Sequence, residues 1–352
     1  KRQVDDYPVD GCVNVVMDGR DNRIEGFHMT IKGSYPYGYG DCFGKGGSWT
    51  IKHWKHSALL IRGESNHAKN CTLIHRSYGH GIFMQAARNP IVEGCYVEGE
   101  MRSTDDMLAE TSGPAHAIGF ETVWGYPLPA GYMKSLAEAG IRAYNAGETV
   151  IDGVEYDRGT SNPTILDNTI VNMRVGVTLT HASGTKYVSG CTAIGTERGY
   201  AIGSGIIENC SGDVQYGPIF GVDYESDRGV TADITILPHE GDHYNGSRHF
   251  AYILGSDHNL TFRGTVQNPD QALEVNVGGD KRIESHLDAV ENYTADGIVI
   301  NNLTGYPLIL DDASSDIRGQ SIGAITDNGS GNSMVPKSWS VTSNITFYGS
   351  AT

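Results

Sequence analysis

The sequence contains little charge and no long hydrophobic segment. Only 19% of its 352 residues are charged, and no apolar run approaches the roughly 18 residues that a membrane-spanning helix needs. The charge is mostly acidic, with 26 lysines and arginines against 42 aspartates and glutamates and a net charge of −16. A strongly acidic surface repels a phosphate backbone, so we expect neither a nucleic-acid partner nor a membrane span. A local basic cleft can still bind a polyanionic sugar.

Two further absences narrow the class of protein. Neither a Cys-x-x-Cys pair nor a paired cysteine and histidine spacing occurs, so the pattern predicts no such metal site. No stretch rich in proline and serine divides the chain, which predicts a single domain over residues 1–352. The apolar runs are too short for helices, are rich in valine, isoleucine, threonine and tyrosine, and are bounded by glycine, asparagine and aspartate. The chain is therefore predicted to be all-β.

Four short cysteine-containing segments can be laid over one another. In each, an asparagine or a glycine precedes the cysteine, and Asn168-Thr169 fits the same frame with threonine for cysteine. The frame begins at positions 70, 94, 168, 190 and 209, and the long gap between the second and the third is close to three of the short ones. The strand Ala58–Arg62 also returns one such interval later as Gly81–Gln85. A unit of about 20–25 residues is typical of a β-solenoid. The four segments are Asn70–Leu73, Gly94–Val97, Gly190–Ala193 and Asn209–Gly212.

The repeat predicts a right-handed parallel β-helix that forms one continuous domain. It is obscured between residues 101 and 161, which we interpret as a loop-rich insertion that forms a cleft wall. Within it, Tyr132–Ala139 has the composition of a short helical turn. Residues 255–352 keep the rhythm of short strands but offer few reactive side chains, so we interpret them as C-terminal coils and a cap.

The aligned cysteines and asparagines have a structural explanation. Equivalent positions of a solenoid stack about 4.8 Å apart, so the four aligned cysteines are predicted to form an inward-facing column of small buried side chains. Cys12 and Cys42 lie outside the repeat, and a disulfide between them stays open. The aligned cysteines are Cys71, Cys95, Cys191 and Cys210.

Asn-x-Ser/Thr sequons are frequent and suggest a glycoprotein. Asn70 and Asn209 fall at the predicted tight turn, where asparagine tolerates the left-handed backbone, and Asn259, Asn302 and Asn344 are interpreted as the same turn. A composition rich in asparagine, threonine, serine and glycine and poor in lysine predicts a secreted, extracellular protein. The predicted glycan sites are the remaining sequons, Asn245, Asn292 and Asn328.

Titratable and aromatic side chains concentrate near one seam of the predicted helix. His80 stands between two glycines, which favours an exposed imidazole. Long irregular loops on a compact scaffold are usually functional. Each candidate also has an ordinary explanation, because a surface arginine commonly pairs with a carboxylate on the next coil and an aspartate pair can cap a loop. The candidates are Arg76, Tyr78, His80, Arg102, Asp105, Asp106, Glu110, Trp124, Tyr132, Lys134, Arg142, Arg174 and His181.

Three stretches are the most distinctive of the chain: Gly81–Gln85, Thr104–Glu110 and Gly131–Ser135. They resemble secreted, pectate-lyase-like β-helix proteins that degrade acidic polysaccharides, and in particular the β-helix alginate lyases. Polygalacturonases of this fold carry an aspartate pair one coil before a Gly-His-Gly. Here Gly79-His80-Gly81 precedes Asp105-Asp106, and this reversed order argues against that inverting hydrolase mechanism.

The resemblance implies a polysaccharide lyase that cleaves a uronic-acid polymer by β-elimination. A cation must neutralise the uronate carboxylate, a base must take the C5 proton and an acid must protonate the leaving oxygen. A lysine base needs a lowered pKa, which neighbouring arginines supply. The candidates are Arg102 or Arg142 as neutraliser, Lys134 or His80 as base and Tyr78 or Tyr132 as acid, with Arg76, Asp105, Asp106, Glu110, Trp124, Arg174 and His181 binding substrate.

Three alternatives stay open. A glycoside hydrolase would use two carboxylates from Asp105, Asp106 and Glu110. Calcium held by the same carboxylates is the one cofactor that the sequence indicates, and in a lyase it would act as the neutraliser. The third alternative is a non-catalytic carbohydrate-binding or structural solenoid.

Overall fold

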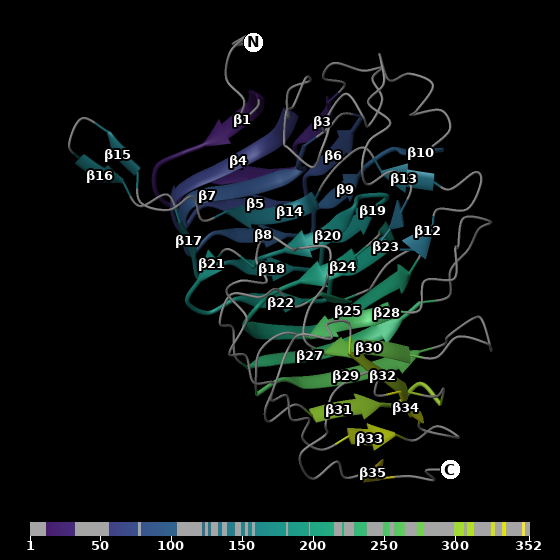
Figure 1. Ribbon diagram of the computed structural model, residues 1–352. Helices are drawn as coiled ribbons and strands as arrows, with labels where there is room; N and C mark the ends of the chain where they lie inside the picture. The colour runs from purple at the N-terminus through teal and green to yellow at the C-terminus, as the bar shows by residue number, and fades with distance from the viewer. Residues whose placement is uncertain are drawn as a thin grey trace.

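The computed structural model is a tapering stack of parallel coils wound from β-strands, with the N-terminus at the wide end and the C-terminus at the narrow end (Figure 1). Every regular element of the described residues is a strand, and none of them belongs to a helix long and apolar enough to cross a membrane. The structure describes residues 12–31, 56–76, 79–103, 122–123, 126–127, 133–135, 139–144, 149–151, 154–156, 159–180, 182–196, 198–214, 220–221, 229–237, 249–253, 257–264, 273–277, 299–305, 308–312, 325–327, 333–335 and 347–348.

One wall of the stack, face A, is the 13-stranded sheet. Its main path takes one strand from each of eleven successive coils, and all of its pairings are parallel. Two short strands, β17 (Thr160–Ser161) and β21 (Ala182–Ser183), extend it at one side. The main path is β1 (Cys12–Met17), β4 (His56–Glu64), β7 (Ile82–Arg88), β14 (Ala139–Tyr144), β20 (Val175–Thr178), β24 (Arg198–Ala201), β26 (Phe220–Gly221), β28 (His249–Ile253), β30 (Leu273–Val277), β32 (Leu308–Asp312) and β34 (Ser333–Val335).

The 16-stranded sheet supplies the other walls. In the first five coils it consists of two rows of short strands, face B1 and face B2. The rows merge at β25 (Gly205–Val214), which pairs with a strand of each row. Face B1 is β2 (Arg23–Glu25), β5 (His67–Lys69), β8 (Ile91–Glu93), β18 (Thr164–Leu166) and β22 (Tyr187–Ser189); face B2 is β3 (His28–Ile31), β6 (Thr72–His75), β9 (Tyr96–Glu98), β19 (Thr169–Val171) and β23 (Thr192–Thr196); the merged row continues as β27 (Val230–Ile236), β29 (Asn259–Gly264), β31 (Val299–Asn302), β33 (Ile325–Asp327) and β35 (Phe347–Tyr348).

Three antiparallel ribbons leave this lattice between β9 and β17. The first ribbon, β10 (Met101–Ser103) with β13 (Met133–Ser135), follows face B2 directly. The second is β11 (Thr122–Val123) with β12 (Tyr126–Pro127), and the third is β15 (Thr149–Ile151) with β16 (Val154–Tyr156). In Figure 1 the first two lie to the right of face A and the third projects to the left.

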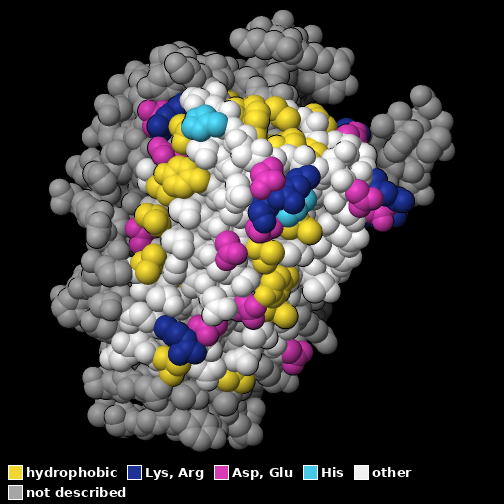
Figure 2. All heavy atoms as spheres, turned by 180° about the vertical axis from the view of Figure 1, so that it is seen from behind, with side chains coloured by type: hydrophobic (Ala, Val, Ile, Leu, Met, Phe, Trp, Pro, Cys, Tyr) yellow, Lys and Arg dark blue, Asp and Glu magenta, His cyan; other side chains and the backbone are white. Residues whose placement is uncertain are grey.

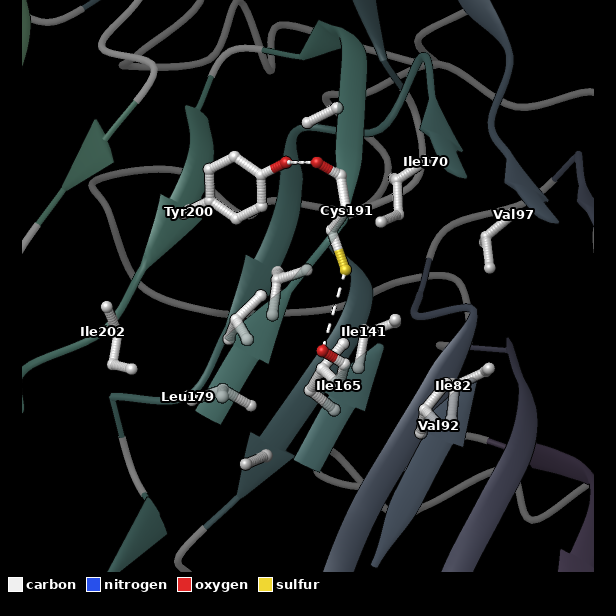
Figure 3. Close-up of a cluster of buried hydrophobic side chains, with 14 of the residues drawn as sticks. Ile82, Val92, Val97, Ile141, Ile165, Ile170, Leu179, Cys191, Tyr200 and Ile202 are labelled. Atoms are coloured by element: carbon white, nitrogen blue, oxygen red, sulfur yellow. Dashed lines mark hydrogen bonds between the residues drawn. The ribbon is translucent and has the colours of Figure 1, made fainter. Parts of the chain in front are cut away.

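The register confirms the predicted parallel β-helix and its period. Leu59 pairs with Ile82 and Ile61 with Met84, so one turn of the coil spans the same interval that the sequence predicts from Ala58–Arg62 and Gly81–Gln85. The inward side chains of these strands are fully buried, because each coil closes over its own apolar residues and those of its neighbours. Figure 3 shows this core, where Ile82 and Ile141 come from adjacent strands of face A and Ile165 comes from face B1.

The predicted cysteine column is present, but the sequence assigns its fifth member to the wrong residue. All four aligned cysteines are free and buried. Thr169 pairs with Tyr96 and Thr192, so Asn168, not Thr169, takes the cysteine position. The preceding Asp167 has the left-handed backbone, with φ of 53°. Backbone bonds of 2.7–2.9 Å trace the column through Phe27, Cys71, Cys95, Asn168, Cys191 and Cys210.

Asn168 replaces sulfur by a hydrogen-bonding side chain in the same buried position. Its Oδ1 accepts the Cys95 amide at 2.8 Å, and its Nδ2 donates to the Val92 carbonyl at 3.0 Å. The side chain is 1% exposed. An amide in this setting is stable only because both ends find partners.

Face A meets face B2 at a line of glycines. A Cβ on Gly81 would lie 2.4 Å from Val97 Cγ1 and 2.6 Å from the Gly140 oxygen. A Cβ on Gly140 would lie 2.5 Å from Ile170 Cγ2, and one on Gly176 would lie 2.4 Å from the Gly199 oxygen. The two walls are therefore too close here for any side chain. The glycines flanking His80 are expected to allow such close backbone approach, and Gly81 does.

The turn interpretation of the sequons is right for two of the sites and wrong for two. Asn70 and Asn209 have φ of 50° and 53°. Asn259 instead lies exposed in β29, and the left-handed residue before it is Asp257, with φ of 62°. Asn302 is buried at the end of β31, where its Oδ1 accepts the Thr304 amide at 3.1 Å. The other sequons and Cys42 lie outside the described residues.

Candidate functional site

Some of the candidate residues that the structure describes lie where successive coils pass from face B2 to face A, here called the B2–A corner. Its segments are residues 76–81, 99–138 and 172–174. The segments begin side by side, because Arg76 Nη1 donates to the Gly99 oxygen at 3.3 Å and Gly99 N–H bonds to the oxygen of Val171, the residue before the third segment, at 2.8 Å.

The longest of these segments carries the β10–β13 ribbon. In this antiparallel pair Arg102 lies directly opposite Lys134. The predicted helical turn at Tyr132–Ala139 is wrong, because Met133–Ser135 forms β13 and β14 begins at Ala139. Pairing with β10 overrides the local helical preference. One of the two candidate neutralisers and one of the two candidate bases, far apart in the sequence, are therefore opposite one another.

Arg76 forms an ion pair with a carboxylate on the next coil, as is common for a surface arginine of a solenoid. Its Nη2 lies 3.2 Å from Glu98 Oε1, and its Nη1 donates to the Gly99 oxygen at 3.3 Å. Tyr96 donates its hydroxyl to Glu98 Oε2 at 2.8 Å, so both carboxylate oxygens are bonded. Burial, followed by the bond to Glu98, raises the pKa of Tyr96 and keeps its hydroxyl a donor. The sequence singles out neither Tyr96 nor Gly99.

His80 does not offer the exposed imidazole that its flanking glycines favour. Its residue is only 3% exposed, and its ring centroid lies 5.4 Å from that of Phe83. The Ala58 amide donates to the His80 oxygen at 3.0 Å, which fixes this backbone inside the lattice just before β7. The predicted exposure of the imidazole is wrong, because the residue is buried just before β7, whereas its role as a base stays a prediction.

Arg142 and Arg174 lie on neighbouring coils and are both half-buried. Arg142 is in β14, where it pairs with Phe83 on one side and Thr178 on the other. Arg174 precedes β20 by one residue. The structure thus places Arg142 on face A itself and Arg174 at its edge.

The remaining candidates lie outside the described residues, and their predicted roles stay predictions. They are Tyr78, Asp105, Asp106, Glu110, Trp124, Tyr132 and His181.

No metal centre is formed by the part of the chain that the structure describes, where no three or more histidine, cysteine, aspartate or glutamate side chains are grouped to hold an ion. The three carboxylates considered for calcium are not among those residues.

The outward surfaces of face B1 and of the merged row carry paired charges. Acidic and basic side chains adjoin one another in small groups (Figure 2). Lys69 Nζ lies 2.5 Å from Glu93 Oε1, and Arg263 Nε lies 2.9 Å from Asp233 Oδ1. Both pairs join neighbouring coils, as the general interpretation of solenoid arginines expects.

Comparison with known proteins agrees with this architecture. Residues 45–211 match the family described as right handed beta helix region. A search of the curated proteins finds no match to the chain. The matched region includes the B2–A corner and the β10–β13 ribbon. A right-handed β-helix is compatible with enzymes that act on polysaccharides, and such enzymes occur among the proteins with this kind of region.

Proposed function

We propose that the protein is a polysaccharide lyase that cleaves a uronic-acid-containing, alginate-like polymer by β-elimination. The observation that carries the proposal is the register that puts Arg102 directly opposite Lys134. Directly opposite residues of an antiparallel pair belong to one face of the ribbon, with Cβ atoms about 4.5–5.5 Å apart. A guanidinium-bearing and an amine-bearing residue are therefore paired at one place beside face A.

The two residues match the two most demanding roles of the reaction. Arg102 neutralises the uronate carboxylate and so stabilises the enolate that develops when C5 loses its proton. Lys134, in its neutral form, takes that proton. The electrons of the C5–H bond form the C4=C5 double bond as the C4–O bond breaks. The leaving oxygen accepts a proton from an acid, for which Tyr132 and Tyr78 are the candidates.

The position of the ribbon supports a polymeric substrate. β14 begins four residues after Ser135, so the ribbon leads directly onto face A (135 to 139). Arg142 follows on that strand, between Phe83 and Thr178 of the adjoining coils. A wall of parallel strands that carries a basic residue fits neighbouring uronate units of one chain. We also propose that the enzyme acts outside the cell, where such polymers are found.

The test is ultraviolet absorbance during incubation with polymannuronate, polyguluronate, polygalacturonate, hyaluronan and chondroitin, each with and without a chelator. We expect absorbance to rise on at least one polymer, because β-elimination leaves a conjugated double bond. Lys134→Gln should then lower kcat by about 10²–10⁴. The matched control is Lys69→Gln, which removes a lysine from face B1 and should leave kcat unchanged.

The other outcomes would identify the alternatives. New reducing ends without absorbance would contradict the lyase and favour a hydrolase that uses Asp105, Asp106 or Glu110. Neither signal on any polymer would favour a binding or structural solenoid. Loss of the absorbance signal with chelator would assign the neutraliser role to a metal ion instead of Arg102.

A further inference from the structure

We infer that Arg76 is a positioning residue for this proposed reaction: by fixing the root of the β10–β13 ribbon at Gly99, it holds Arg102 opposite Lys134. The inference rests on the proposed function.

Gly99 is held from the following coil. Its amide donates to the Val171 oxygen at 2.8 Å. A Cβ at this position would lie 2.2 Å from the Asn172 oxygen and 2.8 Å from Met173 Sδ. The residue is therefore pressed against the next coil, at the last point where the chain still follows the lattice before the ribbon begins.

Arg76 holds the same residue from the preceding coil. Its guanidinium reaches the Gly99 oxygen with one nitrogen and Glu98 Oε1 with the other, at 3.3 and 3.2 Å. Its own amide donates to the Ile31 oxygen at 2.7 Å, which ties the Arg76 backbone to the coil before its own. The planar fork of a guanidinium can serve both acceptors at once, whereas a lysine ammonium acts as a single point charge.

Tyr96 completes the bracket by fixing the carboxylate. Its hydroxyl donates to Glu98 Oε2 at 2.8 Å, so Glu98 is bonded through both oxygens. The Arg76 and Glu98 side chains are 35% and 25% exposed, which weakens screening by water compared with a fully exposed pair. The result is a three-residue bracket on two successive coils, with Gly99 at its end.

The distance from the bracket to the reacting pair is short. Arg102 follows Gly99 by three residues (99 to 102), and an extended chain spans at most about 3.3–3.6 Å per residue. A change in the direction of the backbone at Gly99 therefore moves Arg102 as well. Misplacement of a reacting group by about 1 Å can cost about 10²-fold in rate.

The experiment compares Arg76→Gln and Arg76→Lys with the matched control Arg263→Gln, all in the full chain. Arg263 also pairs with a carboxylate on a neighbouring coil but lies far along the chain from the ribbon. We expect Arg76→Gln to lower kcat about tenfold with little change in KM, and Arg76→Lys to restore only part of it. Hydrogen exchange at residues 99–103 should quicken in Arg76→Gln alone.

A pH profile separates positioning from a general loss of stability. A cation opposite the lysine favours the neutral amine that acts as base. When Arg102 moves away, the ascending limb of the kcat profile should therefore shift to higher pH in Arg76→Gln and stay in place in Arg263→Gln.

The failures can be told apart. If Lys134→Gln is inactive while Arg76→Gln matches Arg263→Gln in kcat and pH profile, the inference is wrong and the proposed function stands. If Lys134→Gln keeps full activity, the proposed function fails. Unchanged hydrogen exchange at residues 99–103 in Arg76→Gln would overturn the inference whatever the activity, because that measurement needs no substrate.

Discussion

The walls of the coil stack and the B2–A corner follow different rules. On the walls that the structure describes, strands pair in parallel with the neighbouring coils, with local register shifts in four of the pairings, and inward side chains are buried. At the corner, three successive connections differ greatly in length, yet Ile141 pairs with Ile82 before the insertion and with Val177 after it. The longest connection therefore leaves the lattice and returns without changing its register. The difference shows how a repetitive scaffold carries one irregular, chemically dense region at little structural cost.

The largest effect on stability is expected from a substitution at Gly140, where face A and face B2 leave no room for a side chain. Gly140→Val should destabilise the protein by about 4 kcal/mol or prevent folding, because its side chain would overlap Ile170 and the Gly176 oxygen. Urea unfolding followed by circular dichroism measures the loss. The control is Gly26→Asn, at a left-handed φ of 65° with open space around it and asparagine at the equivalent position of the next coil. A stability for Gly140→Val equal to that of the control would contradict the close contact of the two walls.

A smaller effect is expected at Asn168, inside the cysteine column. Asn168→Cys restores the residue type of the neighbouring coils and nearly fills the volume, but it leaves the Cys95 amide without its side-chain acceptor and replaces the bond to the Val92 oxygen by a long thiol contact, like the one from Cys95 to the Ala68 oxygen. We expect a loss of about 2–3 kcal/mol in the free energy of unfolding. A neutral result would mean that packing alone, and not the amide hydrogen bonds, determines this position.

These positions also show what the sequence could and could not predict. The period, the strands and the buried cysteines follow from local spacing and composition, and so does the pairing of Arg76 with a carboxylate on the next coil. The frame around Asn168 was wrong by one residue, because aspartate and asparagine can both take the left-handed turn and Asn168-Thr169 imitates the Asn-Cys pattern. Only the pairing with neighbouring coils resolves it.

The candidate site was harder to predict, because it depends on contacts between distant segments. The sequence supplied Arg102 and Lys134 separately, and only the strand pairing places them opposite one another. The predicted exposure of His80 was wrong, because its burial depends on the pairing of the backbone before β7 with the neighbouring coil. Gly99 gave no local signal, since its role comes from residues one coil before and one coil after it.

The smallest predicted effect is a pH dependence of the unfolding free energy caused by Tyr200, a buried residue of face A. The Tyr200 hydroxyl lies 2.7 Å from the Cys191 and Ser211 oxygens (Figure 3 shows the first contact), and burial raises its pKa well above the ordinary value of 10.0. A group whose pKa is raised by folding stabilises the protein below its unfolded pKa, and that contribution is lost as pH rises beyond it. Wild type and Tyr200→Phe should therefore differ in unfolding free energy by a constant amount up to about pH 9.

Above about pH 10 the difference should shrink by about 1.4 kcal/mol per pH unit, because only the wild type must keep that hydroxyl protonated when it folds. Urea unfolding of both proteins from about pH 8 to 11 measures this, and the other tyrosines cancel because both chains contain them. A difference that stays constant to the upper end of this range would mean that the hydroxyl ionises in the folded state. The wall would then admit water at Tyr200, and the contrast between a sealed lattice and a reactive corner would lose its basis.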